Sequence, residues 1–311
     1  VSVNKINTFS VIFDDPSYSE EEYSDFVAKQ YNTNHEKVFL NQYDILNSFE
    51  HWIEHMDDLV PQRDGLPRYL IAQKLSNTGV KVVLSSSGAD ELFAGYYPHL
   101  IWSKSCKLFR LFPNFIPPLL GFIGKITSLY PFEKGGSRTH FLGNLLHAFY
   151  SKNFKYFGET NYFRYGRINK VLKYKSNKKK SKKNDIKYSE PNPYECLYRD
   201  LKNRIPNDSM MREDYLNMAH SVEARVPFMD IDLIEYSLSL PFEMHLKNGI
   251  GKNILKRLAL RYLPNRLLYR PKQGFGYPMG MWMKTVFNKR AEKYFFKEKI
   301  IKEINYKYVQ N

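Results

Sequence analysis

Apolar and polar positions in the first hundred residues repeat in a pattern of short strands separated by helices. Residues 8–13 (TFSVIF), 35–40 (HEKVFL) and 80–84 (VKVVL) predict three short strands, the first of them buried. Between these runs, apolar residues recur at helical spacing and predict helices over residues 20–31, 42–56 and 67–77. Strands that alternate with helices are typical of an α/β protein with a parallel sheet.

From residue 99 onward the pattern is helical and interrupted by prolines, without strand alternation. It predicts helices over residues 99–112, 117–129, 141–149 and 194–203, and a basic amphipathic helix within residues 249–264. We therefore expect an α/β nucleotide-binding part at residues 1–98, followed by a helical part at residues 99–311 that closes over the carboxyl edge of the sheet.

The segment of residues 81–97, KVVLSSSGADELFAGYY, is the most informative in the chain. An apolar strand ends in three serines and a glycine, and Asp90 and Glu91 open the next helix. Small side chains let backbone N–H groups approach phosphate oxygens, and a nearby carboxylate can hold Mg²⁺ on the phosphates. The pattern indicates nucleotide binding at the carboxyl end of a strand.

The composition indicates a globular chain without a membrane span. The 311 residues are 43% hydrophobic and contain no run of about 18 apolar residues. Cys106 and Cys196 lack CxxC spacing, so we expect neither a disulfide nor a zinc site, and we expect a cytoplasmic location. No signal peptide is visible, and because the chain starts at Val1 rather than Met, we expect the natural N-terminus to lie upstream.

The net charge of +15 is concentrated in one insert. Residues 151–187 hold eleven lysines and two arginines against Glu159 and Asp185, with the densest run at residues 178–183. No nucleic-acid-binding motif accompanies this run, so we favour a solvated loop over an RNA or DNA footprint. We expect residues 175–185 to form an exposed loop remote from the active site.

Two C-terminal blocks supply further candidate residues. Within residues 205–241, a structural network of arginines and carboxylates explains most of the block. Its arginines are Arg212 and Arg225, and its carboxylates are Asp208, Glu213, Asp214, Glu223, Asp230 and Asp232. Within residues 270–278, RPKQGFGYP, Lys272 lies between a proline and two glycines. By residue type alone, this lysine suits a phosphate clamp and a plain structural position about equally.

Together these blocks resemble the synthetase domain of glutamine-dependent asparagine synthetases, members of the ATP-pyrophosphatase superfamily. That family carries sequences like SGEGADELFGGY, MAHSLEVRVPFLD and RPKQGFGVP, which residues 85–96, 218–230 and 270–278 match in order. A family pattern D-E-P…LPTYLL is similar to residues 57–70. The resemblance implies a partial parallel sheet of the adenine-nucleotide alpha-hydrolase type, followed by a mainly helical subdomain.

The resemblance also implies a reaction and its residues. Aspartate attacks the α-phosphorus of ATP to give β-aspartyl-AMP and pyrophosphate, Mg²⁺ stabilises the pyrophosphate, and ammonia then displaces AMP. The positions that match family site residues are Val11, Ser85, Ser86 and Gly88 for ATP, Asp90 for Mg²⁺-pyrophosphate, and Lys272 and Asp208 for catalysis. Lys272 would neutralise charge that develops at phosphorus.

Departures from the family pattern bear on activity. The family's pyrophosphate loop, a sequence like SGGLDS, and its glutaminase domain, which supplies ammonia, are not found in these residues. We therefore expect this chain alone to be inactive, because Asp90 and Lys272 cannot replace a phosphate-binding loop. Ser87 replaces the loop glutamate and Ala94 one glycine, and a serine cannot act as a base without help. The sequence therefore leaves open which carboxylate is the acceptor substrate.

Three alternatives remain at the level of sequence. The first alternative is a non-catalytic, degenerate paralogue, and the second is a different amide-forming ligase in surface-polymer synthesis. The third is a nucleic-acid-binding protein that uses residues 178–183, and we do not expect this one. The expected partners are ATP, an aspartate-like carboxylate and ammonia, with no membrane. The resemblance also allows a homodimer of the longer parent protein.

The resemblance makes two structural predictions. The candidate site residues converge at one cleft, with Lys272 no more than about 15 Å from Asp90. The strand with the missing pyrophosphate loop lies between the strands at residues 8–13 and 80–84. We therefore expect either a break in the sheet there or direct pairing of those two strands.

Overall fold

The computed structural model describes residues 5–56, 64–111, 191–270, 277–285 and 287–293. The chain divides into two compact units. The first unit contains residues 1–86, 208–227 and 259–300, and the second contains residues 87–207, 228–258 and 301–311. The division at residue 98 that the sequence suggested stays a prediction.

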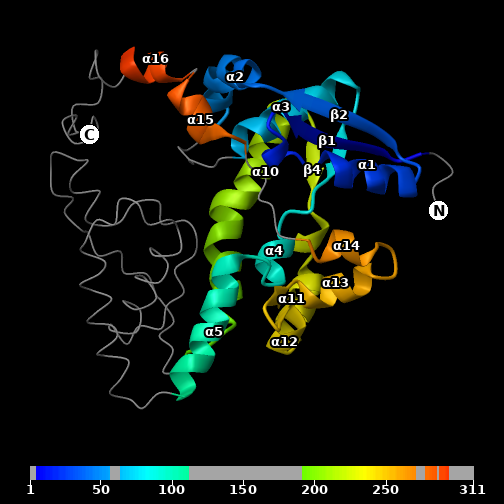
Figure 1. Cartoon of the computed structure of the whole chain (residues 1–311), viewed down its shortest axis with the longest axis vertical. Helices are drawn as coiled ribbons and strands as arrows, with labels where there is room; N and C mark the ends of the chain where they lie inside the picture. Colours follow the sequence, from blue (N-terminus) through cyan, green and yellow to red (C-terminus); the bar gives the residue numbers. More distant parts are fainter. Residues whose placement is uncertain (1–4, 57–63, 112–190, 271–276, 286, 294–311) are drawn as a thin grey trace. The chain divides into compact units, whose positions relative to one another are not determined.

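The first unit begins with a parallel β-α-β element (Figure 1). Strand β1 (Asn7–Phe13) pairs in parallel with β2 (Asn34–Leu40), in a register that places Val11 opposite Val38. Helix α1 (Glu21–Gln30) lies between them in the chain and packs against both strands. The sequence prediction for these three elements is confirmed to within one residue at each end.

Two helices follow, and the first begins at a capping box. The Asn41 side chain accepts a hydrogen bond from the Asp44 N–H at 3.2 Å, and the Asp44 carboxylate accepts one from the Asn41 N–H at 2.9 Å. A cap of this kind stabilises α2 (Gln42–Glu54) by about 1 kcal/mol. Helix α3 (Gly65–Asn77) packs against α2 and against α10 (Met210–Met218), so distant parts of the chain meet in this unit.

A second parallel pair consists of β3 (Val82–Leu84) and β4 (Glu223–Arg225). The sequence pattern predicted no strand in this part of the chain, and β4 shows that this was wrong. Three residues with two charged side chains are too short and too polar to show strand alternation, and β4 is a strand because it hydrogen-bonds to β3. In the described residues β1 and β3 belong to separate two-stranded sheets, which rules out direct pairing of these two strands. The predicted break at the position of a missing strand stays a prediction.

One hydrophobic core joins the strands of the first unit to its C-terminal segments. The Phe13 ring lies 6.3 Å from the Tyr277 ring and 6.4 Å from the Trp282 ring, between centroids. Short helices α14 (Asn265–Leu268), α15 (Met279–Lys284) and α16 (Asn288–Ala291) belong to these C-terminal segments. The buried members of the core are Val11, Phe13, Val38, Leu40, Ile45, Leu66, Tyr69, Leu70, Leu216, Tyr277, Trp282 and Phe287.

The second unit is mainly helical. Its described helices are α4 (Ala89–Leu92), α5 (Tyr97–Leu111), α9 (Glu195–Arg199), α11 (Ile231–Ser239), α12 (Phe242–His245) and α13 (Asn253–Ala259), with a π-helical stretch η2 (Asp200–Ser209) after α9. A short antiparallel hairpin, β5 (Leu246–Lys247) and β6 (Ile250–Gly251), precedes α13. The helix predicted within residues 249–264 is therefore shorter than expected. Gly249 and Lys252 have φ values of +83° and +54°, which a right-handed helix does not allow.

The second unit buries both cysteines. Cys106 on α5 and Cys196 on α9 are free thiols in a core with Trp102 and Leu197. Burial raises the pKa of the Cys196 thiol. The predicted helices at 117–129 and 141–149 and the basic insert at 151–187 lie outside the described residues. In the part of the chain that is described, no helix has both the length and the hydropathy needed to cross a membrane.

Candidate functional site

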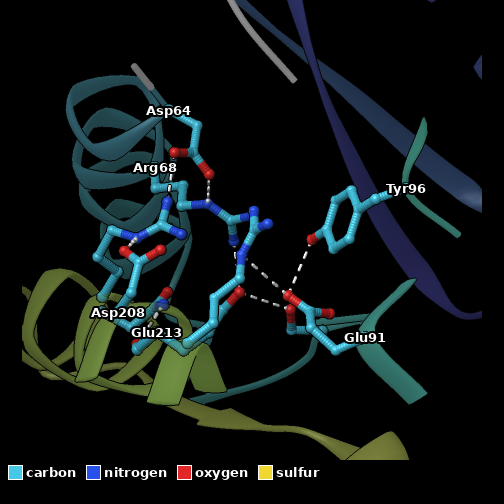
Figure 2. Close-up of polar contacts among 10 residues, drawn as sticks. Asp64, Arg68, Glu91, Tyr96, Asp208 and Glu213 are labelled. Atoms are coloured by element: carbon cyan, nitrogen blue, oxygen red, sulfur yellow. Dashed lines mark hydrogen bonds and ion pairs between the residues drawn. The ribbon is translucent and has the colours of Figure 1, made fainter. Parts of the chain in front are cut away.

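The first unit contains a continuous series of ion pairs at the contact of α3 with α10 (Figure 2). Arg68 Nε lies 2.9 Å from Asp64 Oδ2, and Arg68 Nη1 pairs with Glu213. Arg212 pairs with Asp64 through Nη1, and Arg212 Nε lies 2.8 Å from Asp208 Oδ1. Positive and negative groups therefore alternate without a gap from Glu213 to Asp208.

Helical spacing explains how the sequence builds this series. Asp64 and Arg68 are four residues apart, as are Asp208 and Arg212, so each acid and base lie one helical turn apart. The packing of α3 on α10 then brings the two acid–base pairs together.

The ion pairs are shielded from solvent, and their arrangement favours the charged forms of Asp64 and Arg68. The side chains of Glu213, Arg212 and Asp208 are 6, 7 and 7% exposed. Burial acts to raise the pKa of the Asp64 carboxyl, but attraction to Arg68 and Arg212 outweighs burial and lowers this pKa. Burial alone would lower the pKa of the Arg68 guanidinium, but attraction to Glu213 and Asp64 outweighs burial and raises this pKa. Asp64 and Arg68 therefore remain ionised at neutral pH.

Ser85, a predicted ATP-loop residue, joins the Glu213 end of the series. Its hydroxyl donates a hydrogen bond to Glu213 Oε1 at 2.9 Å. Its N–H donates to the carbonyl of Arg225 at 2.9 Å, directly after the β3–β4 pairing. The structure thus brings two predicted site residues, Ser85 and Asp208, into one network, here called the Ser85–Asp208 network. Its members are Ser85, Glu213, Arg68, Asp64, Arg212 and Asp208.

Val11, the residue predicted to contact adenine, lines a cavity of about 460 Å³ along β1 and α1. This volume is in the range of small-molecule sites. His35 lies in the wall, with Nδ1 2.9 Å from the Thr8 hydroxyl and Nε2 3.0 Å from the Ser10 hydroxyl. The lining combines aromatic side chains such as Tyr23 with these polar groups, which suits a flat, partly polar ring.

In the second unit, Gly88 and Asp90 form the start of α4. Gly88 has a φ of +92°, which favours glycine, and a Cβ there would lie 2.2 Å from the Cε of Met229, so that side chain would have to move. Asp90 lies in the first turn of α4, and its Oδ1 is 2.9 Å from the Nζ of Lys252. The resemblance assigned Asp90 to Mg²⁺-pyrophosphate, and the structure adds a cationic neighbour.

A buried polar cluster follows in the same unit. The Tyr96 hydroxyl donates to Glu91 Oε1 at 2.8 Å (Figure 2), and Arg204 Nε lies 3.5 Å from the same oxygen. Burial, and then the charge of Glu91, raise the pKa of Tyr96, so its hydroxyl stays protonated and donates. His99 Nε2 lies 2.8 Å from Asp200 Oδ2, with His99 fully buried.

The structure places most, but not all, of the predicted site residues. Val11, Ser85, Ser86 and Asp208 belong to the first unit, and Gly88 and Asp90 to the second. Ser86 is exposed, whereas Asp208 is buried. Lys272 lies outside the described residues. The convergence of all these residues on one cleft stays a prediction.

Sequence reasoning missed Asp64, Arg68 and Lys252. The repeated i,i+4 spacing of an acid and an arginine was a usable signal for Asp64 and Arg68. Nothing comparable marked Lys252, because it is one of many basic residues in its block.

The family resemblance assigns Mg²⁺ to Asp90, which would supply one carboxylate to an ion that is bound mainly through phosphates. In the described residues, no group of three or more His, Cys, Asp or Glu side chains is arranged to hold a metal ion. Mg²⁺ commonly takes one or two protein carboxylates and fills its remaining positions with water and substrate phosphates. A single carboxylate at a helix start meets that requirement.

Comparison with known proteins places these features in a family. The sequence model described as asparagine synthase matches residues 2–310. Asparagine synthetase (glutamine-hydrolyzing) 1 of Bacillus subtilis is 28% identical over 286 residues, which cover 91% of this chain and 44% of that protein. A putative asparagine synthetase (glutamine-hydrolyzing) of Mycobacterium bovis is 25% identical over 286 residues, which cover 90% of this chain and 42% of that protein. The chain therefore spans less than half the length of these curated relatives.

Proposed function

Since the chain belongs to the asparagine synthase family, we propose that it forms the synthetase part of an enzyme that adenylates aspartate and converts it to asparagine with ammonia. ATP-dependent amide synthesis is what the family supports in general. The choice of aspartate and the residue roles below are part of the proposal, as is a cytoplasmic location.

The position of Ser85 carries this proposal. Ser85 directly follows β3, and in open α/β sheets ligands bind at the carboxyl ends of strands. Its hydroxyl is fixed by Glu213, and the ion pairs beyond Glu213 hold that carboxylate in place. Because this O–H is donated to Glu213, the fixed Ser85 oxygen presents lone pairs and suits a donor group of the nucleotide, such as a ribose hydroxyl.

The first step is attack of a carboxylate oxygen on the α-phosphorus of ATP. The bond between the α-phosphorus and its bridging oxygen breaks, and pyrophosphate leaves with that electron pair. In our proposal, the Val11 cavity holds the adenine, Ser85, Ser86 and Gly88 contact the adenylate, and Asp208 lines the site. Mg²⁺, held at Asp90, would neutralise charge on the leaving pyrophosphate. In the first step, Lys272 would also neutralise charge around the phosphorus.

The second step is attack of ammonia on the acyl carbon, which breaks the bond to AMP and releases one proton. Ser87 stands where the family pattern has a glutamate, so the proton released in the second step must pass to another group or to water.

The proposal is tested by ATP–pyrophosphate exchange in the natural polypeptide that contains these 311 residues. Exchange should require both Mg²⁺ and aspartate. Asp90→Asn should lower the exchange rate by at least about 100-fold, since it removes a carboxylate that acts on the leaving group. Lys247→Met, which changes an exposed side chain on β5, is the control and should leave exchange intact. Exchange that is unaffected by Asp90→Asn would contradict the assignment.

Ser87 favours one second candidate, a ligase for a different carboxylate, such as one on a sugar or peptide. The same assay with a panel of sugar acids and peptide carboxylates separates the two. Exchange with one of these compounds but not with aspartate would favour the second candidate. Exchange with no carboxylate would favour a non-catalytic paralogue.

A further inference from the structure

We propose that Glu213 makes Ser85 a hydrogen-bond acceptor for a ribose hydroxyl, so that this chain distinguishes ribonucleotides from deoxyribonucleotides. Glu213 is then a positioning residue for nucleotide specificity that no family motif marks. The inference rests on the proposed function, because it assumes that the adenylate lies at the carboxyl end of β3.

The first observation is that both hydrogen-bond donors of Ser85 are directed into the protein. The Ser85 hydroxyl donates to Glu213 Oε1 at 2.9 Å, and the Ser85 N–H donates to the carbonyl of Arg225 at 2.9 Å. A serine hydroxyl has one proton and two acceptor lone pairs. With its proton directed to Glu213, the Ser85 oxygen meets a ligand as an acceptor.

The second observation is that Glu213 is held in place. Its Oε1, the same atom that accepts from Ser85, pairs with Arg68 Nη1 (Figure 2). Arg68 is itself held by Asp64, whose Oδ2 lies 2.9 Å from Arg68 Nε. A guanidinium only donates hydrogen bonds and an ionised carboxylate only accepts them, so the direction of each bond in this row is fixed. The row therefore keeps the Ser85 proton on the side of Glu213.

The third observation is that the pair of Arg68 and Glu213 departs from the family patterns. Arg68 stands where the pattern LPTYLL has threonine, and Glu213 lies outside the blocks matched at residues 85–96, 218–230 and 270–278. Ser85 itself lies within a matched block. The chain therefore places a partner of its own on a serine that it shares with the family, and such a change alters selectivity rather than the type of reaction.

Nucleotide chemistry then decides which group meets the Ser85 oxygen. Phosphate oxygens are strong acceptors, so they gain no hydrogen bond from a hydroxyl whose proton is directed elsewhere. Ribose hydroxyls donate as well as accept. A ribose hydroxyl that donates to Ser85 extends the row that runs through Glu213 to Arg68. A deoxyribose at this position cannot make that bond, which lowers its affinity.

Isothermal titration calorimetry on the natural polypeptide tests this inference, with AMP, 2′-deoxy-AMP and 3′-deoxy-AMP as probes. These nucleotides lack pyrophosphate, so they report contacts of the adenylate alone. AMP should bind about tenfold more tightly than one of the two deoxy analogues, and the weaker analogue identifies the hydroxyl that Ser85 accepts. Equal binding of all three nucleotides would overturn the inference.

Variants assign this preference for AMP to Ser85 and Glu213. Ser85→Ala should abolish the preference. Thr78→Ala, which removes a hydroxyl that donates to the Leu75 carbonyl at 2.8 Å, is the matched control and should keep it. Glu213→Gln retains Oε1 as an acceptor and should also keep it. If Ser85→Ala does not fold, as judged by circular dichroism, Ser85→Cys replaces it, because sulfur is a weak acceptor.

A double variant tests the part that Glu213 plays. Arg68→Met with Glu213→Met removes both charges of the buried pair together, which avoids an uncompensated charge. The Ser85 hydroxyl can then rotate, so the preference for AMP should fall between those of the wild type and Ser85→Ala. A preference equal to that of the wild type would overturn the role of Glu213.

The outcomes separate this inference from the proposed function. Ribose discrimination without ATP–pyrophosphate exchange leaves the inference in place and contradicts adenylation, whereas exchange without ribose discrimination does the reverse. If Ser85→Ala leaves AMP binding unchanged but alters the preference for aspartate over succinate, Ser85 meets the amino group of the carboxylate substrate instead, and the inference is wrong. No binding of AMP would overturn both.

Discussion

The hydroxyl of Ser85 donates a hydrogen bond to the buried carboxylate of Glu213, 128 residues away in the chain, at 2.9 Å. Ser85 directly follows β3, and Glu213 belongs to α10 and pairs with Arg68. This contact connects the loop that resembles a nucleotide site to a series of buried charges. It makes the position of one hydroxyl depend on residues from two distant segments.

Removal of Glu213 should therefore destabilise the first unit. Glu213→Ala leaves the Arg68 guanidinium without this partner in a buried setting, and we expect a loss of about 3 kcal/mol in the free energy of unfolding. Glu213→Gln keeps an acceptor for Ser85 and should cost less. Urea unfolding of the variants measures both effects.

An exposed ion pair of the same unit provides the control for Glu213. Glu223 and Arg225 lie 2.7 Å apart with side chains 56% and 61% exposed, so Glu223→Ala should have only a small effect on stability. Equal losses for Glu213→Ala and Glu223→Ala would show that burial does not set the energetics of the network.

Gly88 should tolerate no side chain, for two separable reasons. Gly88→Ala places a Cβ on a residue with a positive φ, and this Cβ would lie 2.2 Å from Met229 Cε, which is too close. Gly79 also has a positive φ, +81°, but an added Cβ there meets nothing within 4 Å. We expect Gly79→Ala to lower the free energy of unfolding by about 1 kcal/mol. Gly88→Ala should lower it by about 2 kcal/mol beyond the loss for Gly79→Ala, and urea unfolding measures both. Truncation of Met229 to Ala in the Gly88→Ala background should recover part of that excess, and no recovery would contradict the overlap.

Stability should fall in mild acid because of His245. This side chain is fully buried among aromatic rings, with Phe93 5.8 Å and Phe242 6.0 Å away. Burial lowers the pKa of His245 from its ordinary value of 6.5, and nearby backbone groups offset only part of this. The unfolded chain therefore binds a proton more readily than the folded chain, so this stabilisation is present above pH 6.5 and is lost as the pH falls below it.

His245→Phe should reduce this pH dependence. The phenyl ring fits an aromatic environment and cannot be protonated, so the urea midpoint of the variant should change less than that of the wild type between about pH 7.5 and pH 5. The same midpoint shift in both proteins would show that other groups control the acid sensitivity.

Local patterns predicted much of the first unit. The strands β1 and β2 and helices α1, α2 and α3 lie close to the ranges predicted from apolar spacing. By contrast, β4 was missed because three residues, Glu-Ala-Arg, become a strand only when β3 supplies the hydrogen bonds. The start of α13 was misplaced because left-handed residues at 249 and 252 leave little trace in hydrophobic periodicity.

The candidate site was predicted in part, for a similar reason. Motifs identified Ser85, Asp90 and Asp208 as single positions, yet their partners could not be read from the chain. Lys252 lies 162 residues from Asp90, and only folding selects it among the many lysines. Ion-pair partners that are distant in sequence carry no periodic signal, which is why the charge environment of the site became visible only in the structure.

The central claim, adenylation of a carboxylate, is tested most directly by isotope transfer. The natural polypeptide is incubated with ATP, Mg²⁺, ammonia and aspartate labelled with ¹⁸O in its side-chain carboxylate, and the AMP is analysed by mass spectrometry. Attack of the carboxylate on the α-phosphorus, followed by displacement with ammonia, leaves one labelled oxygen on AMP, and this is the result we predict. Label in inorganic phosphate with formation of ADP would show attack at the γ-phosphorus and would contradict the proposed mechanism.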